Sequence, residues 1–163
     1  MKLRDYQEEI KSRAVNIVKK HRFVYLAMQV RTGKTLTSLG IAKEMGAKRV
    51  LFITKKKAIS SIKSDYNMLK PNFSLDLINY ESLHKIEGSF DLIILDEAHN
   101  MKAYPKPTKG AKQVKIIIKK NDPLVILLSG TPTPESPSEM YDQVYAIPGN
   151  PFNRYMHFYD FAK

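Results

Sequence analysis

The sequence contains no cysteine, which excludes disulfide bonds and thiolate metal sites. Its four histidines, His21, His84, His99 and His157, lack the spacing of a zinc site. Apolar runs such as "LVILL" are too short to span a bilayer, and the N-terminal "MKLRDYQEE" lacks the apolar stretch of a secretory signal. We therefore expect a cytoplasmic protein with no membrane partner.

Acidic residues are also scarce, with 16 Asp and Glu against 27 Lys and Arg and a formal net charge of +11. A summed positive potential of this kind attracts phosphate backbones. A lysine-rich solvated surface would give the same composition, so charge alone leaves both interpretations open. The length of 163 residues, with 43% hydrophobic and 26% charged residues, fits one globular domain with a real core.

Internal repeats are absent, and helical and strand patterns alternate along the chain instead. Strands are expected at residues 23–28, 49–54, 75–80, 90–96 and 123–129, and helices at 4–20, 34–45, 58–70 and 108–120. The strand segments are almost continuously apolar, which is typical of strands whose sheet is covered by helices on both faces. The sequence therefore predicts an α/β domain with a mostly parallel sheet.

The segment "VRTGKT", residues 30–35, leads from a strand pattern into a helix pattern. In that setting backbone N–H groups and the helix N-terminus would face phosphate, and Gly33 would let the backbone approach closely. Lys34 would reach the β- and γ-phosphates, and the Thr35 hydroxyl would bind Mg²⁺. The full phosphate-loop pattern requires glycine where this chain has Met28, so a surface lysine at an ordinary helix start is the alternative.

The segment "FDLIILDEAH", residues 90–99, has the features of the second half of a nucleotide site. Its apolar strand ends in Asp96, whose carboxylate would hold the Mg²⁺ shell, and Glu97 would orient or deprotonate the attacking water. The alternative interpretation is that these two acids only cap the following turn. The presence of "GKT" upstream favours the nucleotide site over this alternative. His99 has a weaker case, since a lone histidine often serves only as a hydrogen-bonding residue.

Six segments in order carry a family resemblance. They are "LRDYQ" (3–7), "VRTGKT" (30–35), "LFIT" (51–54), "INYESL" (78–83), "DEAHNMK" (96–102) and "LLSGTPTPESPSEMY" (127–141). Together they resemble the first-lobe motifs of superfamily-two helicases, and most of all the SWI/SNF-type DNA translocases, a branch with phage and bacterial members. The "LSGTP" and "NYE" forms resemble this branch more than the RNA helicases. The resemblance implies a single RecA-like P-loop NTPase lobe over residues 1–163, in a bacterial or phage-infected cell.

The resemblance also assigns residues to an ATP·Mg²⁺ site. The implied nucleotide contacts are Arg4, Gln7, Arg31, Thr32, Gly33, Lys34, Thr35 and Leu36. Gln7 matches the adenine-reading glutamine of the family, and a carboxamide can bond the N6 and N7 edge of adenine bidentately. Lys34, Asp96 and Glu97 take the catalytic positions, with Thr35 and Asp96 holding Mg²⁺.

Two further sets of residues follow from the same resemblance. Residues matching the motifs that couple the nucleotide site to nucleic acid are His99, Ser129, Gly130 and Thr131. Residues matching the nucleic-acid groove are Thr54, Lys55, Lys56, Asn79, Tyr80 and Lys102. The implied partner is DNA, in duplex form, held mainly through phosphate and sugar with little base specificity.

The helix expected at residues 108–120 is rich in lysine and contains no acid. At about 100° per residue Lys112, Lys115 and Lys119 share one face, opposite apolar residues such as Val114 and Ile118. This pattern predicts an amphipathic helix with a basic outer face. Such a face is usually only solvated, and direct contact with phosphate is the alternative.

The chain departs from the family pattern in two ways. Gln29 stands where the family often has Glu, and the motifs of the second lobe, with the arginines that complete the site, are absent from these 163 residues. Because an arginine finger contributes several orders of magnitude in rate in related systems, we expect weak ATPase activity from this lobe alone. The second lobe would act in cis or in trans, with the chain a truncated or naturally split protein.

The sequence therefore predicts the ATP-binding lobe of a DNA-dependent ATPase that moves on or remodels DNA. Three alternatives remain: a non-catalytic nucleic-acid-binding accessory module, an RNA helicase lobe, and a P-loop ATPase of another type such as a packaging motor.

Overall fold

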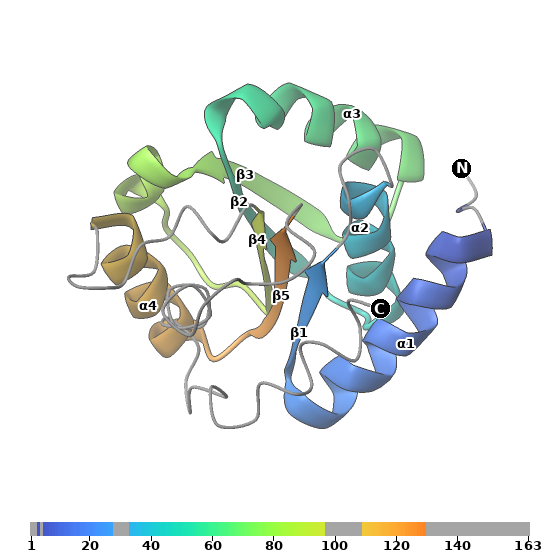
Figure 1. Cartoon of the computed structure of the whole chain (residues 1–163). Helices are drawn as coiled ribbons and strands as arrows, with labels where there is room; N and C mark the ends of the chain where they lie inside the picture. The colour runs from blue at the N-terminus through green and yellow to red at the C-terminus, as the bar shows by residue number, and fades with distance from the viewer. Residues whose placement is uncertain (1–2, 4, 28–32, 97–108, 130–163) are drawn as a thin grey trace.

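A computed structural model describes residues 3, 5–27, 33–96 and 109–129 of the chain. Its sheet consists of β1 (Phe23–Ala27), β2 (Arg49–Thr54), β3 (Ser74–Asn79), β4 (Leu92–Asp96) and β5 (Leu124–Ser129). The strands lie in the order β1-β5-β4-β2-β3, and each neighbouring pair is parallel (Figure 1). The predicted α/β class is confirmed, with a sheet that is wholly parallel across these five strands.

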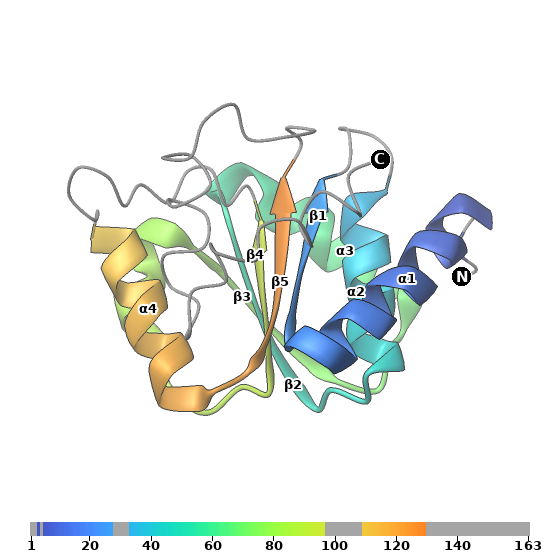
Figure 2. The ribbon, with the colours of Figure 1, turned by 60° about the horizontal axis from the view of Figure 1, so that its bottom comes forward.

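Helices cover both faces of this sheet, as the sequence predicts. They are α1 (Asp5–His21), α2 (Lys34–Glu44), α3 (Ile59–Leu69) and α4 (Lys109–Asn121), with two 3₁₀ helices, η1 (Lys56–Ala58) and η2 (Tyr80–Lys85). Figure 2 shows α4 on one side of the sheet and α1, α2 and α3 on the other. Among the described residues, no helix is both long and apolar enough to cross a membrane.

The apolar core has two halves because successive strand residues point to opposite faces of the sheet. In β2, Leu51 and Ile53 belong to the half that includes Ile118 of α4. The alternate residues Val50 and Phe52 belong to the half that includes residues of α1, α2 and α3. All five side chains are fully buried. This two-sided burial explains why the strand segments read as continuous apolar runs.

Helix α4 has the amphipathic character predicted for it. Val114 and Ile118 are fully buried against the sheet, whereas Lys112, Lys115 and Lys119 are exposed. The apolar face is therefore explained by packing.

Two of the differences from the sequence prediction have a clear physical cause. Tyr80 begins the 3₁₀ helix η2 instead of ending β3, and its ring packs against the core beside α4 while its hydroxyl bonds a backbone carbonyl of β4. Phe90 precedes β4 instead of beginning it, because its backbone N–H donates to Asn121 Oδ1 at 3.0 Å instead of to a neighbouring strand. Side-chain partners distant in sequence decide both positions.

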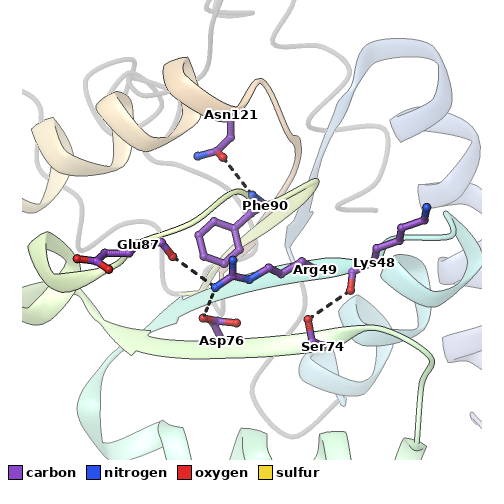
Figure 3. Close-up of polar contacts among 7 residues, drawn as sticks. All are labelled: Lys48, Arg49, Ser74, Asp76, Glu87, Phe90 and Asn121. Atoms are coloured by element: carbon purple, nitrogen blue, oxygen red, sulfur yellow. Dashed lines mark hydrogen bonds and ion pairs between the residues drawn. The ribbon is translucent and has the colours of Figure 1, made fainter.

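The amino-terminal edge of the sheet is held together by Arg49 (Figure 3). Its Nη2 lies 3.1 Å from Asp76 Oδ2 and donates to the Glu87 carbonyl at 3.3 Å. The guanidinium also stands 4.5 Å from the centre of the Phe90 ring. One side chain of β2 thus joins β3 to the segment that leads into β4. This cluster lies at the other end of the strands from the residues predicted to bind nucleotide.

Candidate functional site

The carboxyl ends of β1, β4 and β5 lie next to one another at one edge of the sheet. Ala27 of β1 pairs with Ser129 of β5, and Asp96 of β4 pairs with Leu128 of β5. Figure 2 shows these ends at the upper edge of the sheet. In open parallel sheets this edge is where ligands bind. The register therefore places the predicted magnesium-binding acid and the start of the "SGT" motif at one edge.

Gly33 forms the turn that begins α2. It has a φ of 76°, in the left-handed region, and its carbonyl accepts hydrogen bonds from Thr37 N and Thr37 Oγ1, each at 3.0 Å. Gln7 Nε2 lies 3.4 Å from the same carbonyl, and a Cβ built on Gly33 would overlap the Gln7 carboxamide. The backbone angle favours glycine here, and a Cβ would also force the Gln7 carboxamide to move. Gln7 itself is 4% exposed, and its amide packs against Gly33.

The first turn of α2 follows directly with Lys34, Thr35 and Leu36, all partly buried. The Ser38 hydroxyl donates to the Thr35 carbonyl at 2.7 Å and thereby fixes this turn. There is no acidic residue in the first turn, so the partial positive charge of the helix N-terminus is not offset there by a carboxylate. Such an end is suited to bind an anion.

Asp96 is the centre of the polar contacts at this edge. Its Oδ1 lies 3.3 Å from Lys34 Nζ, and its Oδ2 accepts a hydrogen bond from Thr54 Oγ1 at 2.7 Å. Its backbone carbonyl accepts a hydrogen bond from the Tyr80 hydroxyl at 2.8 Å. The carboxylate is 5% exposed, and among the described residues none donates a hydrogen bond to Oδ1. Oδ1 is thus a buried, charged oxygen whose counterpart is the Lys34 ammonium.

These residues fit the requirements of Mg²⁺. The ion prefers hard oxygen ligands and is usually held by one or two carboxylates together with substrate phosphates and water. Asp96 Oδ1 and the Thr35 hydroxyl are oxygen ligands of that kind. Among the described residues no group of three or more His, Asp or Glu gathers to form a metal site, so Mg²⁺ would need phosphate and water as its other ligands.

The predicted nucleic-acid residues divide into two groups. Lys55, Lys56 and Asn79 line an open pocket of about 490 Å³, together with Lys57 and Glu81. We call these five residues the basic pocket. Lys57 directly follows Lys56, and Glu81 lies in the "INYESL" segment, but the family resemblance assigns neither residue a role. The pocket presents three ammonium groups and one carboxylate to solvent.

Thr54 and Tyr80 do not line this pocket. Thr54 is fully buried, and its hydroxyl bonds Asp96 instead of reaching the surface. Tyr80 is partly buried and also bonds Asp96. The Thr54 side chain has no exposed surface in this structure because its hydroxyl faces Asp96 on the adjacent strand β4, and its contact with nucleic acid stays a prediction. Sequence alone cannot show which end-of-strand side chains turn inward.

Glu81 is the negative member of the basic pocket. Its Oε2 accepts a hydrogen bond from Asn79 Nδ2 at 2.8 Å. That hydrogen bond, assisted by one from the backbone N–H of Glu81 to its own carboxylate and by the charge of Lys56, lowers the pKa of the Glu81 carboxyl. The Glu81 side chain therefore stays negatively charged to a lower pH than the side chain of an isolated glutamate does.

The remaining predicted site residues lie outside the described residues: Arg4, Arg31, Thr32, Glu97, His99, Lys102, Gly130 and Thr131. For Ser129 the structure describes the backbone only, at the end of β5. The contacts of these side chains remain predictions.

The parallel sheet and the glycine-led helix start are those of a RecA-like α/β lobe. The chain belongs to the family of the Type III restriction enzyme, res subunit (ResIII), whose profile matches residues 1–72 and 59–134. No curated protein matches the sequence. The family implies the use of a nucleotide and usually of Mg²⁺.

Two solved structures share the fold. The Sulfolobus solfataricus SWI2/SNF2 ATPase core in complex with dsDNA matches 98% of this chain with a TM-score of 0.75 and 20% sequence identity. The ATP-dependent Type ISP restriction-modification enzyme LlaBIII bound to DNA matches 82% with a TM-score of 0.57 and 22% identity. The chain spans 38% and 13% of the lengths of these two proteins. With the family match, they confirm the predicted resemblance to a superfamily-two, RecA-like first lobe.

Proposed function

We propose that this chain is the ATP-binding lobe of a DNA-dependent ATPase that couples ATP hydrolysis to movement on DNA or to its remodelling. The observation that carries the proposal is the ion pair between Lys34 at the start of α2 and Asp96 at the end of β4. A partly buried cation and a buried carboxylate meet beside a helix N-terminus that is suited to bind an anion. This arrangement suits a triphosphate and its divalent cation.

Lys34 and the N-terminal N–H groups of α2 would bind the phosphates and balance their charge. Thr35 and Asp96 would hold Mg²⁺, which when bound neutralises charge on the phosphates. Glu97 would orient the attacking water. Gln7 would read adenine, and its contact with Gly33 supports a further role in fixing the shape of the loop.

Other residues complete the proposal by their motif positions. The proposed additional nucleotide contacts are Arg4, Arg31, Thr32 and Leu36, and the proposed coupling residues are His99, Ser129, Gly130 and Thr131. Because the arginines of a second lobe would be needed for fast turnover, hydrolysis by this lobe alone would be slow. The second lobe would join in cis or in trans.

The basic pocket supports DNA as the partner. Lys55, Lys56 and Lys57 lie together directly after β2, where they would contact the phosphate backbone without reading bases. The net charge of +11 agrees with a polyanionic partner. Both fold relatives were solved with DNA, one of them with double-stranded DNA, which supports duplex DNA for this chain.

Binding measurements test the proposal. We expect calorimetry to detect ATP binding that is tighter with Mg²⁺ than with EDTA, and labelled duplex DNA to bind with an affinity that falls as salt rises. DNA binding without ATP binding would support a non-catalytic accessory module and contradict the proposal. An RNA duplex of the same sequence that binds more tightly than DNA would favour an RNA helicase lobe.

A further inference from the structure

Two residues, Thr54 and Tyr80, donate hydrogen bonds to Asp96. Both are neighbours in sequence of residues that line the basic pocket. Thr54 precedes Lys55 at the end of β2, and Tyr80 stands between the pocket residues Asn79 and Glu81. The side chains of Thr54 and Tyr80 turn away from the pocket and donate to two different acceptors on Asp96. At two separate places, a residue that lines the pocket is thus the immediate chain neighbour of a residue that donates a hydrogen bond to Asp96.

We propose that Thr54 and Tyr80 are positioning residues through which a phosphate backbone in the basic pocket changes the affinity of the lobe for nucleotide. The inference rests on the proposed function, since it takes Asp96 as part of the nucleotide site and DNA as the occupant of the pocket.

The two hydrogen bonds control different parts of Asp96. Thr54 Oγ1 holds Oδ2 at 2.7 Å and so sets the rotation of the carboxylate, which decides where Oδ1 points. The Tyr80 hydroxyl holds the backbone carbonyl at 2.8 Å and so sets the end of β4. Oδ1 accepts no hydrogen bond from the described residues and faces Lys34. Movement of either donor therefore reaches the one carboxylate oxygen that remains for a ligand.

Burial makes the Thr54 contact a stiff one. Thr54 is fully buried and Asp96 is 3% exposed, so water does not replace the bond when it stretches. An unmet buried polar group is unfavourable, and hydrogen bonds to charged groups are the stronger ones. If phosphate binding shifts the backbone of Lys55 and Lys56, the neighbouring residue Thr54 shifts with it. Asp96 must then move too, because its hydrogen bond to Thr54 is kept.

The residues that line the pocket are packed less tightly than Thr54. Lys55, Lys56 and Lys57 are exposed, and Lys56 and Lys57 lie in the short 3₁₀ helix η1. On the other side of the pocket, Asn79 is bonded to Glu81 at 2.8 Å. A phosphate attracted to the lysines would also meet the Glu81 carboxylate and repel it. Occupation of the pocket thus acts on both segments that contain a hydrogen-bond donor to Asp96.

Coupling between two sites is reciprocal and is measured as a ratio of affinities. The experiment measures ATP affinity by calorimetry in Mg²⁺ and in EDTA, with and without saturating duplex DNA. We expect DNA to change the affinity of the natural chain for ATP by at least about fivefold in Mg²⁺. Thr54→Val and Tyr80→Phe should each bring this ratio close to one. Thr54→Ser keeps the hydroxyl and should restore most of it.

A matched control comes from α3. The Tyr66 hydroxyl donates to the carbonyl of Phe73, a hydroxyl-to-carbonyl bond like that of Tyr80, but joins α3 to the segment before β3. Tyr66→Phe therefore removes a hydrogen bond of the same kind. It should leave the ratio of ATP affinities with and without DNA unchanged. Thr54→Val should also weaken ATP binding in Mg²⁺ by about tenfold with a smaller effect in EDTA, as outer partners of metal ligands do.

The outcomes are distinct. If Thr54→Val and Tyr80→Phe are folded and keep the natural ratio, the inference is wrong, and it is equally wrong if the natural chain binds both ATP and DNA with a ratio of one. If Thr54→Val does not fold, Tyr80→Phe and Thr54→Ser decide the question. Failure of the natural chain to bind ATP at all would overturn the proposed function, and this inference with it.

Discussion

Lys34 Nζ lies 3.3 Å from Asp96 Oδ1, and this ion pair connects the first residue of α2 to the last residue of β4. Their side chains are only 14% and 5% exposed, so water solvates the two charges poorly and each stabilises the other. Removing one partner of a buried pair leaves an uncompensated charge, which is strongly unfavourable. The pair therefore affects the stability of the lobe as well as its proposed chemistry.

Lys34→Ala should abolish measurable ATP binding and lower the free energy of unfolding by about 3 kcal/mol. The first effect follows from loss of the phosphate-binding ammonium, and the second from the isolated carboxylate of Asp96. Calorimetry below the unfolding temperature of the variant measures the first, and denaturant unfolding the second. Lys43→Ala removes an exposed lysine from the other end of α2 and is the control. ATP affinity equal to that of the natural chain would refute the assignment of Lys34.

Gly33→Ala should destabilise the lobe more than Gly46→Ala does. The two glycines have similar φ angles of 76° and 72°, so both substitutions place an alanine in the left-handed region at about 1–2 kcal/mol. A Cβ on Gly46 meets nothing within 4 Å, whereas one on Gly33 overlaps the Gln7 carboxamide. The difference between the two variants in denaturant unfolding isolates that overlap.

A double variant completes this test. Adding Gln7→Ala to Gly33→Ala removes the overlapping amide, so part of the lost stability should return, and the two substitutions should not be additive. Strict additivity would show that Gln7 and Gly33 do not interact in solution.

Lys56→Ala should weaken duplex DNA binding and lower the slope of log K against log salt by about one, the change expected when one phosphate contact is lost. Lys48→Ala is the matched control, because Lys48 is an exposed lysine just before β2 and Lys56 lies just after it. Both variants lose one positive charge, but at opposite edges of the sheet. Equal losses of affinity would mean that net charge and not the basic pocket binds DNA.

Asn79→Ala should raise the pKa of Glu81 towards its ordinary value, since the Asn79 hydrogen bond is the largest cause that lowers it. A lowered folded-state pKa adds stability above the unfolded pKa of about 4.3, and this stability is lost as pH falls through the folded value. The free energy of unfolding of the variant should therefore depend less on pH in this acidic range. Carboxyl NMR titration measures the pKa, with exposed Asn67→Ala as the control. An unmoved Glu81 titration would contradict the role of Asn79.

The sequence predicts the strands and helices well because both sheet faces are buried and the patterns are strong. It also predicts that Lys34 and Asp96 share an edge, since Asp96 ends one parallel strand and Lys34 follows another. It does not predict the inward turn of Thr54 or the 3₁₀ start at Tyr80, because their partner Asp96 becomes a neighbour only when β4 pairs with β2. Contacts of this kind depend on register, which local pattern leaves open.

Arg49 is a second residue whose role appears only in the folded chain, and Arg49→Lys should destabilise the lobe by about 1 kcal/mol. A guanidinium reaches Asp76, the Glu87 carbonyl and the Phe90 ring together, and a lysine ammonium cannot reproduce that planar set of contacts.

The Arg49 pair is partly exposed, at 39% and 33%, so solvent screening keeps the expected effect small. Arg22→Lys makes the same substitution at the more exposed pair with Asp122, at 58% and 81%, and should change stability less. Denaturant unfolding measures both variants, and ATP affinity should stay unchanged in Arg49→Lys because Arg49 lies at the edge of the sheet opposite Asp96. Equal stability of the two variants would show that the Arg49 contacts contribute no more than an ordinary surface ion pair.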